Sequence, residues 1–212
     1  ILNFVAPSFT SNTQTISDGT DHVDPASLRG LGPDQVLVLI NGKRRHTSSL
    51  INVNGTFGRG SVGTDLNAIP AAAIKRLEVL RDGAAAQYGS DAVAGVINLV
   101  MKKSVKPFVN TSYSVTTEGD GAQYQLETGF GVNLADKGYA NFTFSYFDQE
   151  RTQRAGTVSS VEDEAGYWGV TDDSNFNTSD LTAFLDKNPS AGFQVGLPDM
   201  TITNFSYNMG YT

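Results

Sequence analysis

Strict alternation between apolar and small polar residues in the second half of the chain is the feature that most constrains its fold. The clearest example is residues 204–211, NFSYNMGY, and the same pattern occupies residues 109–115, 123–133 and 140–146. Successive side chains of a strand point to opposite faces, so each stretch predicts a strand with one aromatic face and one polar face. Strands of about 9–11 residues with two such faces are typical of transmembrane β-barrels.

The connections between these stretches are unequal in length, which also favours a barrel. Residues 118–122 and 135–138 are short, whereas residues 148–199 form a connection of roughly fifty residues, and outer-membrane barrels combine short turns on one side with long loops on the other. A soluble antiparallel sandwich alternates as well and remains the alternative, although strands of soluble proteins average only about 5–6 residues. Four strands cannot close a barrel, because an open edge in lipid leaves backbone groups unpaired. We therefore expect the chain to be the N-terminal part of a longer protein.

Residues 69–103 predict a compact unit of short helical and extended pieces. Pro70 suits the first turn of a helix, because its missing N–H would be unpaired there anyway. Residues 76–79 alternate between charged and apolar side chains, which is a strand pattern. Residues 84–88 predict a second short helix with a left-handed glycine cap after it, and residues 93–101 predict a buried strand.

A strand–turn–strand signal precedes this unit. Residues 36–40, VLVLI, predict a buried strand, Asn41-Gly42 is the strongest short hairpin signal, and residues 43–46 predict the return strand. Residues 47–67 form a polar, glycine-rich connection that contains a formal GxGxxG at 58–63. A dinucleotide site would need a strand directly before this motif and a helix directly after it, and the sequence predicts neither.

The motifs of the first half occur in an order and spacing that resemble those of one known family. They are RGLG at 29–32, VLVLING at 36–42, IP at 69–70, IKRLEVLRDG at 74–83, YGS at 88–90 and AGVIN at 94–98. Over about residues 18–103 this pattern is similar to the plug domain of TonB-dependent outer-membrane receptors. The departures from the family pattern are small and are found at Asn41, Lys75, Leu77, Asp82-Gly83 and Ala94.

The resemblance implies an α+β plug domain over residues 1–103, followed over residues 104–212 by the first transmembrane strands of an antiparallel β-barrel. The barrel would be incomplete in this chain, and residues 148–199 would form a long extracellular loop. The distribution of charge supports a boundary near residue 103. Residues 1–103 hold 10 Lys and Arg against 8 Asp and Glu, whereas residues 104–212 hold 5 against 14.

The resemblance also implies a function, which is active transport across the outer membrane of a Gram-negative bacterium. A scarce nutrient, such as an iron chelate, cobalamin, a sugar or a peptide, would bind on the outer side. The energy transducer TonB, pairing with a segment that is not in this chain, would then drive remodelling of the plug and import. The implied partners are TonB, the nutrient ligand, outer-membrane lipid and a surface lipoprotein. Nothing in the chain is basic enough to predict a nucleic-acid partner.

The resemblance points to two sets of functional residues. In such plugs the loop after the hairpin helps to contact the ligand, and the candidates here are Asn52, Asn54, Phe57 and Arg59. Family plugs also carry arginines and a glutamate that face carboxylates of the barrel, and the matching positions are Arg29, Glu78 and Arg81. Such contacts suit a plug that must be held and then released, because charge pairs exchange with water more readily than apolar packing does. The alternative is that Glu78 and its arginine neighbours only solvate a strand face.

The sequence contains no recognisable catalytic or metal-binding motif. It has no cysteine, two histidines and no GxSxG or HExxH, so we predict no enzyme activity, no cofactor and no metal site. Asp21-His22-Val23-Asp24 predicts a surface turn, and the acidic residues between 162 and 173 lack the ligand spacing of a calcium loop. Residues 180–187 predict a short helix capped by Ser179. Two rival functions stay open, a structural or adhesive barrel and a signalling receptor with an additional N-terminal domain.

Overall fold

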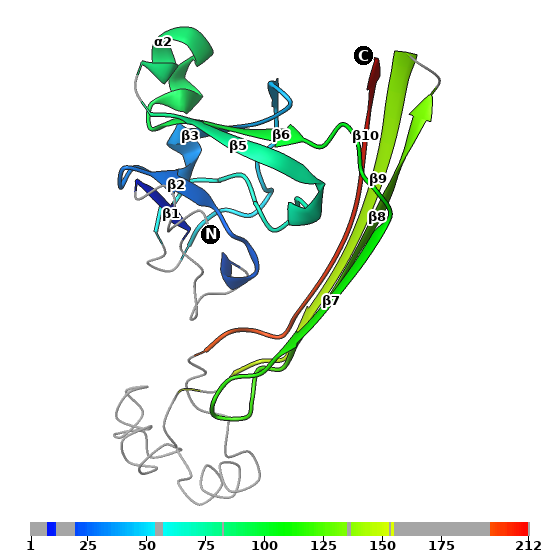
Figure 1. The fold of residues 1–212 in the computed structure, drawn as a ribbon. Helices are drawn as coiled ribbons and strands as arrows, with labels where there is room; N and C mark the ends of the chain where they lie inside the picture. Colours follow the sequence, from blue (N-terminus) through cyan, green and yellow to red (C-terminus); the bar gives the residue numbers. More distant parts are fainter. Residues whose placement is uncertain are drawn as a thin grey trace, which may run out of the picture.

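The computed structural model describes residues 8–11, 20–53, 57–81, 83–134, 137–152, 154 and 196–211. These residues form a two-stranded sheet, a four-stranded mixed sheet and a four-stranded sheet of long antiparallel strands. We call residues 8–103 the N-terminal unit and the sheet of long strands the wall. Figure 1 shows the N-terminal unit on the concave side of the wall. Three expectations fall outside the described residues: the candidate Asn54, the helix at 180–187 and the acidic residues at 162–173.

The N-terminal unit is built on the mixed sheet. In spatial order its strands are β4 (Lys43–Arg44), β3 (Val36–Ile40), β6 (Gly95–Met101) and β5 (Ile74–Leu80). Strands β3 and β6 run parallel, and the other neighbours run antiparallel. The two-stranded sheet of β1 (Phe9–Ser11) and β2 (Ala26–Leu28) contacts the mixed sheet through β2 and β3. The strands predicted at 36–40, 76–79 and 93–101 are therefore present, and they become direct neighbours through β6.

The chain reverses between β3 and β4 at the predicted hairpin. Asn41 and Gly42 have φ angles of 51° and 78°, and two positive φ angles define the type I′ turn that an Asn-Gly pair favours. The short helices are η1 (Thr20–His22), η2 (Pro33–Gln35), η3 (Ala71–Ala73), α2 (Ala84–Tyr88) and η4 (Ser90–Ala92). The cap of α2 differs from the prediction. Gly89 has φ 97° and ψ −173°, so its backbone is not left-handed helical, although the positive φ still favours glycine.

The hydrophobic core of the N-terminal unit lies on both faces of β3. Val36 and Val38 pack on one face with Ile97 of β6. Leu37 and Leu39 pack on the opposite face, in a cluster that includes side chains of α2 and η4. A strand covered on both faces needs apolar side chains at every position, which explains the continuous VLVLI run. Full burial of one such side chain contributes about 1.5–3 kcal/mol, so this strand is a major source of stability.

The wall consists of four antiparallel strands in the order β10-β9-β8-β7. They are β7 (Phe108–Ser114), β8 (Gln123–Leu134), β9 (Gly138–Gln149) and β10 (Met200–Tyr211). Three of them have 12 residues each, which is long enough to cross the hydrocarbon layer of a membrane. The expected fold class, an α+β unit followed by long antiparallel strands, is confirmed. The boundary at residue 103 stays a prediction and falls between the end of β6 and the start of β7.

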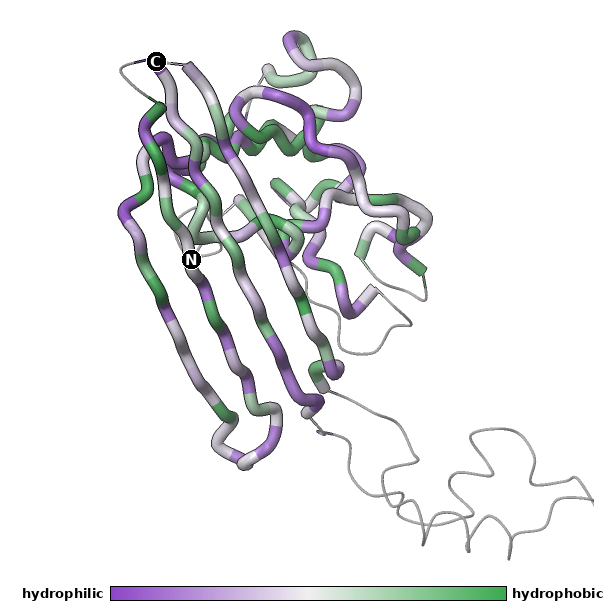
Figure 2. Tube along the Cα trace, turned by 90° about the vertical axis from the view of Figure 1, so that its right-hand side faces the viewer, coloured by the Kyte–Doolittle hydropathy of each residue, from purple (hydrophilic) through white to green (hydrophobic). Residues whose placement is uncertain are grey.

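The wall has one apolar face and one polar face, as the alternation predicts. Along β10, the side chains of Phe205, Tyr207, Met209 and Tyr211 are 55 to 91% exposed. The polar residues between them point toward the N-terminal unit, and Figure 2 shows the alternating hydropathy along the long strands. A soluble sandwich would pack a second sheet on this apolar face, and the described residues place none there. The exposed band is the kind of surface that lipid covers.

No helix within the described ranges is long and apolar enough to cross a membrane.

Replacement of Gly95 by alanine should destabilise the N-terminal unit strongly. Gly95 has φ 141°, and a Cβ there would lie 2.6 Å from the Leu80 carbonyl oxygen. We expect Gly95→Ala to lower the free energy of unfolding by about 2–4 kcal/mol, because backbone strain and a clash with a main-chain atom add. The control is Gly83→Ala, where φ is 68° but a Cβ meets no atom within 4 Å; we expect about 1 kcal/mol there. Urea unfolding measures both, and equal losses would contradict the argument.

Candidate functional site

The polar face of the wall carries the N-terminal unit. Helix η3 contacts β8 and β9, and asparagine side chains of β9 and β10 form hydrogen bonds with the unit. These side chains are Asn141, Asn204 and Asn208. The contact buries the inner face of β9, where Asn141 is 4% exposed and Thr143 is 3% exposed. The interface between the two parts is therefore polar, in contrast to the apolar core of the unit itself.

A cavity of about 480 Å³ separates the N-terminal unit from part of the wall. Its lining is mixed: apolar side chains such as Ile69, Phe147 and Met200 lie beside the polar residues Asp21, Asn67, Gln125, Glu127, Ser145, Gln149 and Asn204. The cavity lies at the end of the wall where β9 ends and β10 begins, next to the long connection. Amides and carboxylates from both parts line it, so a polar molecule could form hydrogen bonds across the interface.

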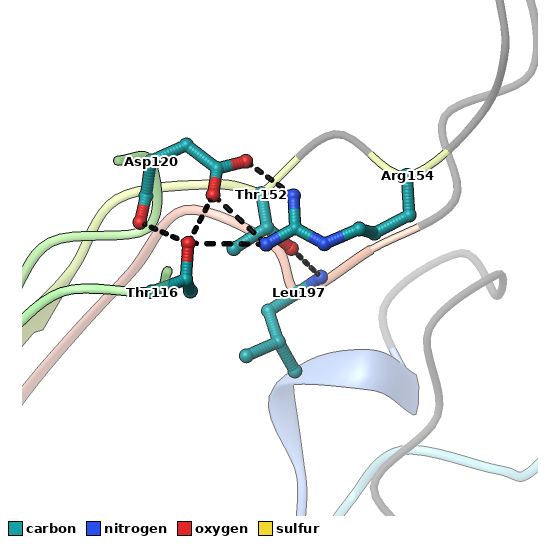
Figure 3. Close-up of polar contacts among 5 residues, drawn as sticks. All are labelled: Thr116, Asp120, Thr152, Arg154 and Leu197. Atoms are coloured by element: carbon teal, nitrogen blue, oxygen red, sulfur yellow. Dashed lines mark hydrogen bonds and ion pairs between the residues drawn. The ribbon is translucent and has the colours of Figure 1, made fainter. Parts of the chain in front are cut away.

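A cluster of polar contacts, which we call the clasp, closes the same end of the wall (Figure 3). The Arg154 guanidinium donates to both oxygens of the Asp120 carboxylate, at 2.6 and 2.8 Å. The Thr116 hydroxyl donates to the same carboxylate at 2.5 Å. Beside them, the Thr152 N–H donates to the Leu197 carbonyl at 3.0 Å, and the Leu197 N–H donates to the Thr152 hydroxyl at 2.8 Å. The clasp thus ties the β7–β8 turn to both ends of the long connection.

Electrostatics support the clasp. The hydrogen bonds that Arg154 donates to the Asp120 carboxylate raise the pKa of Arg154 above its ordinary value, so this guanidinium keeps its charge at every accessible pH. Bidentate pairing of arginine with carboxylate is among the stronger polar contacts in proteins. The side chains of both partners remain about one-third exposed, so solvent screening keeps the contribution of the pair to stability small.

The comparison with known families identifies the N-terminal unit. Residues 1–96 match the family described as TonB-dependent Receptor Plug Domain. The chain carries a TonB-dependent receptor plug domain. The resemblance read from the RGLG, IKRLEVLRDG and AGVIN motifs is thereby confirmed, and we call the N-terminal unit the plug from this point.

Similar proteins include receptors and a transporter. The chain is 38% identical to the ferric enterobactin receptor PirA of Pseudomonas aeruginosa over 154 residues, which are 68% of this chain and 20% of that protein. It is 34% identical to the vitamin B12 transporter BtuB of Vibrio vulnificus over 119 residues, 56% of this chain and 17% of that protein. The chain thus spans about a fifth of the length of the curated relatives that it matches.

A solved structure shares the fold. A variant of the ferric enterobactin receptor PfeA of Pseudomonas aeruginosa, in complex with enterobactin, aligns with a TM-score of 0.54 at 20% identity. The alignment covers 78% of this chain and 24% of that chain. This likeness extends beyond the plug match, so it supports the placement of the wall strands as well as the plug.

The predicted ligand-contact residues lie in the plug loop between β4 and η3, and they differ in exposure. Phe57 is 37% exposed and Arg59 is exposed, so both side chains are accessible. Asn52 is 3% exposed, and its backbone pairs with Ser61 and Gly60 across the loop. The Asn52 backbone therefore holds the loop together, and its buried side chain could reach a ligand only after the loop rearranges. The role of these residues as ligand contacts stays a prediction.

The predicted locking residues have partners inside the plug. Arg29, with φ 57°, donates from its guanidinium to the Arg81 carbonyl at 2.8 Å. The Glu78 carboxylate accepts hydrogen bonds from the Asn98 amide at 2.8 Å and from Arg76 at 2.7 Å. The Asn98 amide, followed by Arg76, lowers the pKa of Glu78 below its ordinary value. Their role in locking the plug to barrel carboxylates stays a prediction.

Sequence reasoning missed the wall residues that contact the plug. Asn141, Asn204 and Asn208 were assigned only to the polar faces of their strands. Asn204 donates to the Asn67 carbonyl at 2.8 Å, across 137 residues of sequence. One signal in the sequence is that amide side chains occur among hydroxyl side chains on the polar faces of the wall strands. The two-residue alternation does not say which of these amides contact the plug.

In the described part of the chain, no group of three or more histidine, aspartate or glutamate side chains is arranged to hold a metal ion.

Glu78→Gln should reduce plug stability in a pH-dependent way. The folded-state pKa of Glu78 lies below the ordinary value of 4.5, so its carboxylate contributes stability above that pH and loses the contribution as pH falls through the lowered pKa. We expect Glu78→Gln to be less stable than the parent chain at pH 7, and the difference to shrink as pH falls below 4.5. Urea unfolding at several pH values measures this. A difference that does not change with pH would contradict it, and Asn98→Leu should move the pKa of Glu78 back toward 4.5.

Arg154→Ala should loosen the clasp without unfolding the wall. Because solvent screens this exposed charge pair, its loss predicts only about a two- to fivefold faster hydrogen exchange at the N–H groups of Thr152 and Leu197. The control is Arg151→Ala, because only the backbone N–H of Arg151 is bonded to the neighbouring Asp199. Hydrogen exchange with mass spectrometry distinguishes the two variants. An equal acceleration in both would show that the Arg154 pair does not hold the clasp.

Proposed function

We propose that this chain is the plug and first wall strands of an outer-membrane receptor that imports a scarce nutrient with energy from TonB. The observation that carries the proposal is the seating of a TonB-dependent receptor plug on the polar face of long strands whose opposite face is apolar and exposed. A plug placed in this way would lie inside a barrel, and the aromatic face would lie in lipid. We propose an outer-membrane location for the same reason.

The arrangement of the connections supports an orientation. The β7–β8 turn and the long connection lie at one end of the wall, where the clasp joins them. Long loops of outer-membrane barrels are extracellular, so this end faces outward in our proposal. The cavity between plug and wall lies at the same end. A nutrient arriving from outside would then meet the cavity and the loop that carries Phe57 and Arg59.

The class of nutrient is proposed from the relatives. Their names refer to ferric enterobactin and vitamin B12, so an iron chelate or cobalamin is the first choice, with sugars and peptides as further candidates. We propose Phe57 and Arg59 as ligand contacts, because an aromatic ring and a guanidinium are exposed on one loop. The relatives are named as receptors and a transporter, which supports transport rather than enzyme chemistry for this protein. TonB and a surface lipoprotein remain proposed partners.

Uptake by the full-length protein should depend on TonB. In cells that express it as the sole receptor of its kind, we expect radiolabelled ferric enterobactin or cyanocobalamin to accumulate, and accumulation to fall to background when TonB is deleted. The reason is that the plug blocks the route until work is done on it. Uptake that proceeds unchanged without TonB would refute energised import and favour a passive or structural barrel.

A pair of variants separates ligand contact from general damage in the same assay. Arg59→Ala should reduce binding of the transported ligand about tenfold, in line with the loss of one charged hydrogen bond. Lys75→Ala, an exposed cation on β5 away from the loop, is the control. Equal effects of the two changes would remove Arg59 from the ligand site.

A further inference from the structure

Three asparagines from different elements converge where the chain leaves β6. Asn208 of β10 donates from Nδ2 to the Lys102 carbonyl at 2.9 Å, and Asn141 of β9 donates to the same carbonyl at 3.0 Å. Asn41, in the β3–β4 turn, donates to Oδ1 of Asn208 at 3.1 Å, and its own Oδ1 accepts the backbone N–H of Met101 at 2.9 Å. We call Asn41, Lys102, Asn141 and Asn208 the amide seam.

The plug holds the Lys102 carbonyl in a fixed position. The Lys102 N–H donates to the Ala73 carbonyl at 2.9 Å, and Nζ donates to the Ala72 carbonyl at 2.7 Å. The same ammonium lies 5.9 Å from the centre of the Phe108 ring, within the range of a cation–π contact. Because three groups fix this residue, its carbonyl presents two lone pairs toward the wall in one orientation.

Gly131 leaves space in the wall for the contacts of the seam. A Cβ on Gly131 of β8 would lie 2.3 Å from Oδ1 of Asn141 and 2.8 Å from the carbonyl oxygen of Val105. Only a glycine therefore leaves room for the segment after Lys102 and for the Asn141 amide together. Asn141 is 4% exposed, so its amide is shielded from water and depends on protein partners. Removal of a hydrogen-bond partner costs more free energy for a buried polar group than for an exposed one.

The hydrogen bonds from Asn41, Asn141 and Asn208 in the seam join neutral groups. These are amide groups and a main-chain carbonyl, which do not titrate between about pH 3 and pH 10. The ion pairs between described residues lie either within the plug or between connections of the wall strands. They join His22 with Asp21, Arg44 with Asp91, Arg76 with Glu78, and Arg154 with Asp120. Salt screens contacts between charges and has much less effect on neutral hydrogen bonds.

The seam and the cavity lie at opposite ends of the interface. Asn141 is near the start of β9 and Asn208 is near the end of β10, away from the long connection. The cavity is lined by Gln149 and Met200, which lie beside that connection. A smaller cavity of about 280 Å³, lined in part by Asn41, Met101 and Asn208, lies beside the seam. The larger open space separates plug and wall at the other end, where Asn204 donates a hydrogen bond to the Asn67 carbonyl.

We propose that the amide seam is the fixed attachment of the plug to the wall, with Asn208 as the positioning residue that holds the Lys102 carbonyl. The strength of this attachment is independent of salt and pH, and the plug separates from the wall first at the cavity end. The proposed attachment does not depend on the proposed function. The role in import of an interface that separates first at the cavity end does rest on the proposed function.

Hydrogen exchange of the full-length receptor in detergent micelles, in sub-denaturing urea, tests the attachment without ligand or TonB. We expect peptides that cover residues 41–45 and 99–105 to exchange more slowly than peptides that cover residues 64–70 at the cavity. The difference should be the same in 0.05 M and 1 M NaCl. Earlier exchange at the seam, or loss of its protection in high salt, would overturn the proposal. A failure of TonB-dependent uptake would leave this result unaffected, so the two proposals fail separately.

Variants of Asn208 assign the effect to its amide. Asn208→Leu removes one donor and one acceptor and should speed exchange of the seam peptides about tenfold or more. Asn133→Leu makes the same change on the polar face of β8, at an exposed residue, and should leave the seam unchanged. Equal effects of the two variants would overturn the assignment.

A third variant keeps the test decisive if Asn208→Leu fails to fold. Asn208→Asp retains the acceptor for Asn41 but places a carboxylate against the Lys102 carbonyl. Seam exchange, corrected for intrinsic rates, should be fast at pH 7 and slow again below about pH 4, where the protonated carboxyl can donate. A double-mutant cycle of Asn41→Ala and Asn208→Ala should be non-additive. A flat pH profile or additive effects would overturn the role of Asn208.

Discussion

The plug rests on a polar surface, and this constraint shapes both parts of the molecule. The inner faces of β9 and β10 carry amides and hydroxyls that the plug covers, and buried groups of this kind need hydrogen-bond partners. The plug supplies main-chain carbonyls, at Asn67 and Lys102, and the Asn41 amide. The requirement explains why residues at a turn and at a strand end, where backbone groups are free, make the contacts.

Different forces hold the plug together and hold it in place. Inside the plug, both faces of β3 are covered by aliphatic side chains such as Val38 and Leu39, so unfolding exposes apolar surface to water. At the wall, each hydrogen bond contributes only about 0.5–1.5 kcal/mol net, because water can replace the lost partner. Changing the contacts between plug and wall therefore costs less free energy than unfolding the core of the plug.

The two ends of the interface between plug and wall differ in their contacts. One end has the clasp of Asp120 and Arg154, the cavity and the roots of the long connection, so groups from several segments face open space there. The other end has Asn41, Asn141 and Asn208 around one carbonyl, with Gly131 leaving room for close approach. If import proceeds as proposed, this asymmetry gives the plug one end that separates from the wall and one end that remains bonded to it.

Much of the fold follows from local patterns. The type I′ turn at Asn41-Gly42 is set by two residues that tolerate positive φ, and the β3 run is set by burial on both faces. The prediction of a left-handed cap at Gly89 was wrong, because the ψ angle of Gly89 depends on how η4 follows α2. The candidate site was less accessible to prediction: Phe57 and Arg59 are exposed, but the burial of Asn52 comes from pairing across its own loop.

The sequence by itself determined the strands of the wall, the face that each residue occupies and the family of the plug, because period, turn chemistry and motif spacing are local properties of the chain. Tertiary structure alone decided which polar residues meet. Asn41 and Asn208 form a hydrogen bond across 167 residues, and no local pattern distinguishes Asn208 from the other amides on its face. The choice depends on where a folded plug comes to rest on a folded wall, and that position is set by the packing of many residues at once.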